Sequence, residues 1–390
     1  MTEKVQQSLA KLRSWCEQEQ FKGWDPYDGL TSRFFQSLPG IRKVRLFRLI
    51  WIQAFKRNPV NLRKLFLIKK DYNAKGVGLF LNGYCNLYNI DPREEYLPHI
   101  RFLSDKVLEL KSEGYSGACW GYHFDWESKA FFQPRNTPTI VASTFIGYAL
   151  LDAWEILKDE KLLKAAVSIS EFILKDLNRT YDDQGDFSFS YSPLDTSQVY
   201  NATLLGSRLL SRIYSITKDE SLLKEAKHSV DFVIKHQQEN GSWTYSPLPF
   251  HQWIDNFHTG YNLECLYEYE KYSGDKSYRT NIEKGFEYYI NTFFEEDGRC
   301  RYYNNSLYPI DIHAPAQLII TLSRLEFFHQ HKDLADKVLS WVIDNMQDRR
   351  GYFYFQLKRR TKSRIPYMRW AQGWMFFSMS TFLRMDQNSG

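Results

Sequence analysis

The chain has 390 residues, of which 43% are hydrophobic and 25% charged, with only 13 prolines and 20 glycines. This composition supplies enough apolar surface for a large buried core, which excludes a disordered, collagen-like or low-complexity protein. Aromatic residues make up 17% of the chain, and aromatic faces outside a core tend to line clefts for ring-shaped ligands, so a sugar or a prenyl group would suit it.

The net charge of +5 is concentrated near the N-terminus. Residues 29–70 contain eleven Lys and Arg and no acidic residue, and residues 44–52 alternate apolar and cationic side chains. Such a segment is typical of a helix that lies on anionic lipid headgroups, and we expect peripheral contact with an anionic membrane. The alternative is an ordinary helix whose basic edges are solvated.

The cysteines and the N-terminus indicate the compartment. The five cysteines are widely spread and form no C-x-x-C pair, so neither a disulfide framework nor a Cys-rich zinc site is expected. Residues 1–20 are polar and charged, unlike a secretory signal, and no stretch approaches 18 uninterrupted apolar residues. We therefore expect a cytoplasmic protein, at most peripheral at the inner face of the membrane.

A repeat runs through the chain from residue 117 onward. A glycine followed by aromatic or small residues recurs at Gly117, Gly185, Gly241, Gly298 and Gly351, at intervals of 68, 56, 57 and 53 residues. Small residues that open the next helical pattern follow the same period, with spacings of 60, 58, 54 and 57 residues; these anchors are Ala142, Ala202, Gly260, Ala314 and Ala371. Each unit is therefore predicted to be a helical hairpin.

Helical hairpins of this length build either an open superhelix or a closed toroid. Small residues at the start of the first helix of each pair indicate crowding around a central axis, which favours the toroid. A further unit at residues 76–111 brings the number of hairpins to about six. We predict an all-α fold, an (α/α)6 toroid at residues 76–390, with residues 1–75 as a basic N-terminal extension that forms an extra helical layer.

At this point the sequence resembles the (α/α)6-toroid enzymes, which include the six-hairpin glycosidase-like superfamily and the prenyltransferase and terpenoid-cyclase toroids. Residues 237–243 fit the Q-x-x-x-G-x-W element of terpenoid-cyclase toroids, which caps helix ends and carries no chemistry. Residues 23–30 and 120–126 resemble uncharacterised bacterial proteins linked to surface-polysaccharide synthesis.

The cyclase and prenyltransferase branches lack their chemical motifs in this sequence. The D-x-D-D motif is absent, and Asp182-Asp183 is the nearest approach to it. Asp297 and Cys300 are spaced by three rather than two residues, and no histidine follows His331 to complete a zinc site. Nucleotide-binding and serine- or zinc-hydrolase motifs are absent as well. We therefore expect no metal and no cofactor, and the glycosidase-like branch remains.

In a toroid, residues just before each inner helix converge on the central cavity. Two successive repeats place a carboxylate and an imidazole there, Asp255 with His258 and Asp311 with His313. Two acids across a cleft are suited to glycoside hydrolysis, whereas a histidine near a tyrosine, such as Tyr261, is suited to remove a sugar proton in elimination or epimerisation. Both chemistries stay open. The structural alternative is that the two aspartates are helix N-caps.

Further candidates follow from the same placement rule. Asp125 lies between aromatic residues, where its pKa would be raised so that it acts as an acid, although a loop aspartate bonded to backbone is equally expected. Trp126, Trp253 and Trp370 are candidate platforms for sugar stacking, and the alternative is that they plug the ends of the toroid.

Arg364 and Arg369 belong to a segment, residues 349–369, that mixes cations with Tyr and Phe. Such a segment is suited to phosphate, uronate or single-stranded nucleic acid. The overall pI near 8.7 is modest and no nucleic-acid motif is present, so we expect no nucleic acid and favour an acidic glycan or a lipid pyrophosphate.

Taken with the resemblance, these residues predict a carbohydrate-active enzyme, a glycoside hydrolase, polysaccharide lyase or uronate epimerase. Its expected substrate is an acidic or lipid-linked glycan of surface-polysaccharide metabolism. The alternatives are a non-catalytic glycan-binding or assembly protein and a terpenoid-handling toroid.

Overall fold

Six helices form an inner ring in the computed structural model, which describes residues 1–128 and 131–387. Each inner helix contacts the next one along the chain, and the last contacts the first, so the ring is closed. The inner helices are α5 (Ala74–Ile90), α7 (Ile140–Leu157), α9 (Tyr200–Thr217), α11 (Asn256–Ser273), α13 (His313–Arg324) and α15 (Trp374–Gln387). The predicted all-α toroid is confirmed.

The inner helices are buried on nearly every side, and the charged residues that α9 and α11 bury pair with one another, as Arg208 does with Glu264 and Glu268. α7 is long and apolar enough to pass for a membrane span by composition, but most of it is buried inside the ring. Close packing explains the small residues at the helix starts: a Cβ atom on Gly260 would lie 2.8 Å from Gln317 Cγ and from Thr321 Oγ1 of the next inner helix.

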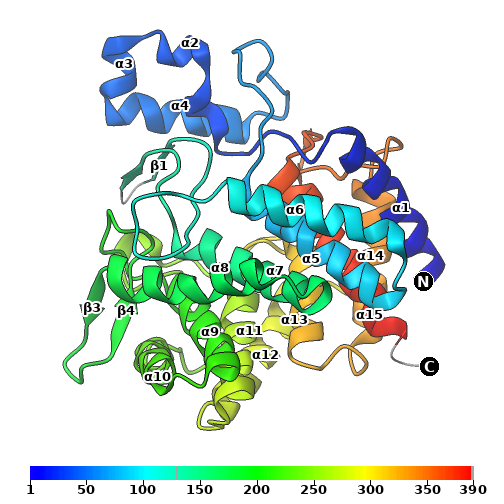
Figure 1. Cartoon of the computed structure of the whole chain (residues 1–390). Helices are drawn as coiled ribbons and strands as arrows, with labels where there is room; N and C mark the ends of the chain where they lie inside the picture. Colours follow the sequence, from blue (N-terminus) through cyan, green and yellow to red (C-terminus); the bar gives the residue numbers. More distant parts are fainter. Residues whose placement is uncertain (129–130, 388–390) are drawn as a thin grey trace.

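The outer ring consists of amphipathic helices that bury one stripe each. They are α6 (Leu97–Glu109), α8 (Glu160–Glu171), α10 (Glu220–Ile234), α12 (Arg279–Phe293), α14 (Lys332–Met346) and α1 (Thr2–Gln18). α1 packs against α14 and α15 through Val5, Leu9, Leu12 and Cys16, and so is the outer partner of the last inner helix (Figure 1). We expected residues 1–75 to form an extension outside the toroid. In the structure α1 belongs to the outer ring instead, because its apolar stripe packs against α14 and α15.

The extra helical layer is formed by α2 (Arg33–Gln36), α3 (Pro39–Lys43) and α4 (Arg45–Arg57), which stand to one side of the rings (Figure 1). We call residues 28–70 the N-terminal layer. It has a small core of its own, made by Leu30, Phe35 and Ile52. Glu127 joins it to the toroid, because this buried carboxylate pairs with Arg48 at 2.7 Å and with Arg45 at 3.3 Å.

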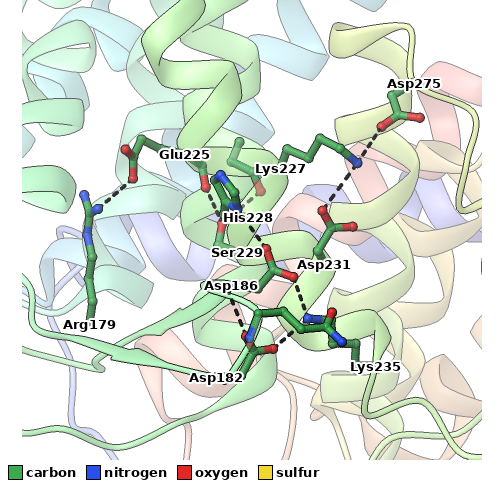
Figure 2. Close-up of polar contacts among 12 residues, drawn as sticks. Arg179, Asp182, Asp186, Glu225, Lys227, His228, Ser229, Asp231, Lys235 and Asp275 are labelled. Atoms are coloured by element: carbon green, nitrogen blue, oxygen red, sulfur yellow. Dashed lines mark hydrogen bonds and ion pairs between the residues drawn. The ribbon is translucent and has the colours of Figure 1, made fainter.

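Short antiparallel strands connect the hairpins: β1 (Trp126–Glu127) with β2 (Phe132–Gln133), β3 (Arg179–Tyr181) with β4 (Phe187–Phe189), and β5 (Ile310–Asp311), β6 (Gln356–Leu357) and β7 (Lys362–Ser363) in that order. Figure 2 shows how ion pairs fasten the β3–β4 hairpin to α10. Lys235 reaches Asp182 at 2.7 Å and Asp186 at 2.6 Å, and His228 Nδ1 lies 2.8 Å from Asp186. The polar side chains of this cluster pair with one another and therefore serve to hold the hairpin.

Candidate active site

A narrow pocket opens at the starts of α9 and α11. Its lining residues are Asn201, Trp243, Thr244, Tyr245, Trp253, Asp255, His258, Thr259 and Asn262. Asn201 comes from the first turn of α9, and Asp255, the N-cap of α11, is followed by polar members from the first two turns of that helix. Thr244 and the aromatic members come from the connection that precedes α11. The repeat therefore gathers the expected residue types at the expected end of the helices.

Asp255 both caps α11 and orients an imidazole. Its Oδ1 accepts the backbone N–H of His258 at 3.0 Å, and its Oδ2 accepts Trp253 Nε1–H at 3.2 Å and His258 Nδ1–H at 2.7 Å. With Nδ1 donating, Nε2 of His258 holds the lone pair. This Nε2 makes no hydrogen bond to any residue that the structure describes, and the ring is half-buried. The pocket thus contains an oriented base with a free nitrogen.

Two amides and an aromatic pair complete the pocket. The Oδ1 atoms of Asn201 and Asn262 are buried, and neither has a partner within the described ranges. Buried polar atoms are normally hydrogen-bonded, so these two oxygens are unsatisfied acceptors in the pocket wall. Trp253, which is 36% exposed, stacks on Tyr245 with ring centroids 4.7 Å apart, and Tyr245 lies 4.8 Å from the His258 ring. The exposed indole offers a face on which a sugar ring can stack, while the pocket beside it is too narrow to admit a water molecule in this structure.

His313 lies deeper, beside the ring of Tyr261. The Tyr261 hydroxyl lies 2.8 Å from His313 Nε2, and the Phe257 ring stacks on the imidazole at 4.3 Å. Burial, and next to it the charge of Lys75, holds the pKa of His313 well below its usual range. Burial also raises the pKa of Tyr261, so the tyrosine keeps its proton and donates it to a neutral imidazole. The Tyr261 ring centroid lies 5.9 Å from that of His258 and 5.9 Å from that of His313, so the tyrosine lies next to both histidines.

Asp311 lies among hydrogen-bond donors and does not line the pocket. Its side chain accepts the backbone N–H of His313 at 2.9 Å, Trp370 Nε1–H at 2.9 Å and the Gln356 amide. Burial raises its pKa to about 6. These contacts give Asp311 a structural task, which is to hold the first turn of α13 and the Trp370 indole. Trp370 lies 5.2 Å from His313 and so borders the deeper part of the site.

The remaining candidates lie elsewhere. Asp125 accepts the backbone N–H of Arg135 at 2.7 Å and lies against the N-terminal layer, which agrees with the loop alternative. Trp126 is beside the same layer, 5.9 Å from Tyr27. Arg364 is exposed, 5.3 Å from the Tyr354 ring. The structure therefore separates these three side chains from the pocket.

Arg369 is buried against Asp25. This aspartate lies in the stretch of residues 23–30, to which the sequence analysis gave no chemical role. Its Nε donates to Asp25 Oδ2 at 2.6 Å and its Nη2 to Oδ1 at 2.9 Å. This bidentate pair neutralises the guanidinium and ties the segment before the N-terminal layer to the start of the last inner helix. In this structure Arg369 therefore has a structural role.

Lys75 is a functional candidate that the sequence reasoning missed. It is the second residue of α5 and only 4% exposed, and its Nζ makes no hydrogen bond to any described residue. The ammonium lies 3.9 Å from the Phe145 ring centroid and 5.2 Å from that of Trp374. Burial, followed by the charge of Arg369, lowers its pKa well below the usual value. The sequence signal that could have indicated it is a lysine in the otherwise apolar start of a helix.

Among the residues that the structure describes, no group of three or more His, Cys, Asp or Glu is placed to hold a metal ion. All five cysteines are free thiols.

No family model matches the chain, and no curated protein matches it in sequence. Solved structures match it in fold. A cellobiose 2-epimerase from Bacillus thermoamylovorans superposes with a TM-score of 0.63 at 13% identity, over 80% of this chain and 88% of that one. A GH76 alpha-mannanase of Bacteroides thetaiotaomicron gives 0.62 at 11% identity, over 81% and 88%. A D-mannose isomerase gives 0.57 at 13% identity, over 81% and 87%. The chain shares their fold.

Proposed function

We propose that this protein is a carbohydrate-active enzyme that transfers a proton at a sugar carbon beside a carbonyl group, as in epimerisation or isomerisation. The observation that carries the proposal is the His258 imidazole, which Asp255 orients while its Nε2 stays free in a polar pocket. The shared fold with an epimerase and an isomerase supports the same choice.

Hydrolysis fits the pocket less well. Glycosidases use a pair of carboxyl groups across the scissile bond. Asp255 is the one carboxylate among the residues that line this pocket, and it is already bonded to His258 and Trp253. Asp311, the expected second acid, is occupied by three donors. The imidazoles are the groups left with proton-transfer capacity.

The proton transfer balances without a cofactor. In an open-chain aldose the carbonyl at C1 acidifies the C2–H bond, so His258 Nε2 can take this proton while the electron pair forms an enediolate. Return of a proton to the opposite face of C2 gives the epimer. Return to C1, together with transfer of the O2 hydroxyl proton to O1, gives the ketose. Tyr261 and His313 hold the next transferable proton beside His258. General acid–base groups of this kind contribute on the order of 100-fold or more to the rate.

We further propose that the substrate is acidic. Lys75 supports this, because it lies near His313 and Tyr261 without a hydrogen-bonding partner among the described residues. Arg369 is neutralised by Asp25, whereas the amine of Lys75 has no neighbouring anion among the described residues to hold its proton. A carboxylate or phosphate on the sugar would restore its charge.

The proposal includes a lipid-linked glycan of surface polysaccharides as the substrate class, with the protein acting in the cytoplasm at the inner face of the membrane. What supports this part is the basic, apolar exterior of the N-terminal layer.

Deuterium exchange tests the proposed chemistry. The purified protein is incubated in D2O with neutral aldoses, uronates and reducing disaccharides, and NMR follows deuterium at C2 together with new epimer or ketose signals. We expect exchange with a preference for acidic sugars, and about a 100-fold loss of kcat in His258→Asn. His329→Asn, an exposed histidine outside the site, is the matched control and should retain full activity.

Release of new reducing ends without exchange at C2 would show a hydrolase, and an unsaturated uronate product would show a lyase. Sugar binding without turnover would show a binding protein. Each of these results overturns the proposed proton transfer.

A further inference from the structure

The N-terminal layer carries an unusual share of the exposed apolar surface. Sixteen large hydrophobic side chains are exposed among the described residues, and nine of them fall between residues 34 and 67. Their exposed fractions range from 39% to 72%; they are Phe34, Ile41, Val44, Leu46, Phe47, Ile50, Val60, Leu65 and Leu67. Clustered exposure of this kind marks an interaction surface.

α4 shows that this exposure is built into the fold. One side of the helix buries Ile52 and Phe55 against the layer and the toroid. Leu46, Phe47 and Ile50 lie in its first two turns and face outward, continuing the exposed Ile41 and Val44 of the preceding segment. The layer stands apart from both rings, so no other part of the described chain covers this side (Figure 1).

The same surface is cationic. Seven basic side chains of the layer are exposed: Arg33, Arg42, Lys43, Arg45, Arg57, Lys64 and Lys69. Residues 29–70 contain no acidic side chain to balance them. Ion pairs to acids outside this range use Arg45, Arg48, Arg63 and Lys70. Six of the seven exposed cations therefore have no carboxylate partner within the described ranges: Arg33, Arg42, Lys43, Arg57, Lys64 and Lys69.

We propose that the N-terminal layer docks on an anionic lipid bilayer through this surface. Interleaved large apolar and basic side chains match the two parts of such a membrane, since the apolar groups enter the headgroup region while the cations meet lipid phosphates. A protein partner fits less well, because the core of a protein interface is depleted in charged residues, whereas cations lie among the apolar side chains throughout this surface.

Docking places the membrane close to the candidate site. Lys56 of α4 donates to the Tyr27 hydroxyl at 2.7 Å, and the Tyr27 ring lies 5.8 Å from Trp370, beside His313. Trp51 Nε1–H of the same helix donates to the Gly29 carbonyl at 2.9 Å. The lipid-facing helix is thus bonded to the segment that borders the site, although the docking itself does not depend on any catalytic activity.

Vesicle flotation of the full chain tests the docking. Vesicles of phosphatidylcholine alone are compared with vesicles containing phosphatidylglycerol, at about 50 mM and about 300 mM salt. We expect binding to the anionic vesicles that weakens as salt screens the charges. Leu46→Ser/Phe47→Ser/Ile50→Ser and, separately, Arg42→Gln/Lys43→Gln should each weaken binding about tenfold. These side chains are exposed, so the variants keep the fold.

Matched controls lie on the toroid. Leu194→Ser/Phe250→Ser removes exposed apolar groups elsewhere, and Lys276→Gln/Lys284→Gln removes the same charge elsewhere. Both should bind like the unaltered protein. No binding to anionic vesicles at low salt, equal binding to both vesicle types, or full binding by the layer variants would overturn the proposal. So would a dimer in analytical ultracentrifugation that the triple serine variant disperses, because the surface would then be an interface between two copies.

Discussion

At the scale of single residues, Lys75 lies in an environment that is unfavourable to its own charge. It is surrounded by aromatic rings and by Arg369 nearby, and its pKa is lowered chiefly by burial. Such a residue reduces stability when it serves a ligand rather than the fold. The acidic substrate proposed above would supply the anion that this side chain lacks.

Replacing Lys75 should stabilise the protein. Because its folded pKa is lowered, the unfolded chain binds a proton that the native chain does not, between the folded pKa and about 10.4. The free energy of unfolding of the unaltered protein thus rises with pH in this window. Lys75→Met should lack that slope and be more stable near neutral pH by about 1–3 kcal/mol. Urea unfolding at several pH values measures it.

Lys276→Met, at an exposed position on the toroid, is the control and should change stability little. A Lys75→Met variant that is less stable than the unaltered protein, or that keeps its pH slope, would contradict the assignment.

The residues of the site were predicted unevenly, for a physical reason. Asp255, His258 and Trp253 were found because a repeat places equivalent residues at the same end of each hairpin. Asp25 and Lys75 were missed, since their environment is made where the chain closes on itself: Arg369 contacts Asp25 across 344 positions in the chain. A single contact between residues so far apart in the chain produces no repeated pattern in the sequence from which it could be predicted.

At the scale of elements, the inner helices depend on glycines that permit close approach. Gly83 of α5 faces Phe376 of α15, and an added Cβ atom would lie 2.3 Å from the Phe376 Cδ1 position. The contact is with an aromatic ring, which cannot bend away as a flexible side chain would. This glycine therefore sets the spacing at the junction where the inner ring closes.

Gly83→Ala should lower the free energy of unfolding by about 1–3 kcal/mol through overpacking. Thermal unfolding followed by circular dichroism measures the change. Gly40→Ala is the matched control in α3, where an added Cβ atom meets nothing within 4 Å. Equal melting temperatures for the two variants would mean that the junction has more room than its geometry shows.

At the scale of the whole molecule, the outer ring is completed by α1, the first of the described helices. The period in the sequence predicted the hairpins but not the place of α1, because an amphipathic helix looks the same whether it covers the ring from outside or lies in a separate layer. Its partners, α14 and α15, lie at the other end of the chain.

Leu12→Ala should therefore destabilise the entire ring. Leu12 is fully buried in α1, and deleting such a side chain typically costs about 2–5 kcal/mol. We expect one cooperative unfolding transition at a lower denaturant concentration, with hydrogen exchange accelerated as far away as α9. Lys11→Ala, on the exposed face of the same helix, should leave both unchanged. Accelerated exchange confined to α1 would show that this helix is an appendage.

The packing of α1 against α15 also has a consequence for folding during synthesis. During translation α1 leaves the ribosome well before α15, against which it packs and which is the last of the described helices. At synthesis rates of about 5–20 residues per second, the apolar stripe of α1 waits roughly 20–70 s for its partner. A nascent chain with this stripe uncovered is a natural client for ribosome-associated chaperones, and truncated translation products would expose it permanently.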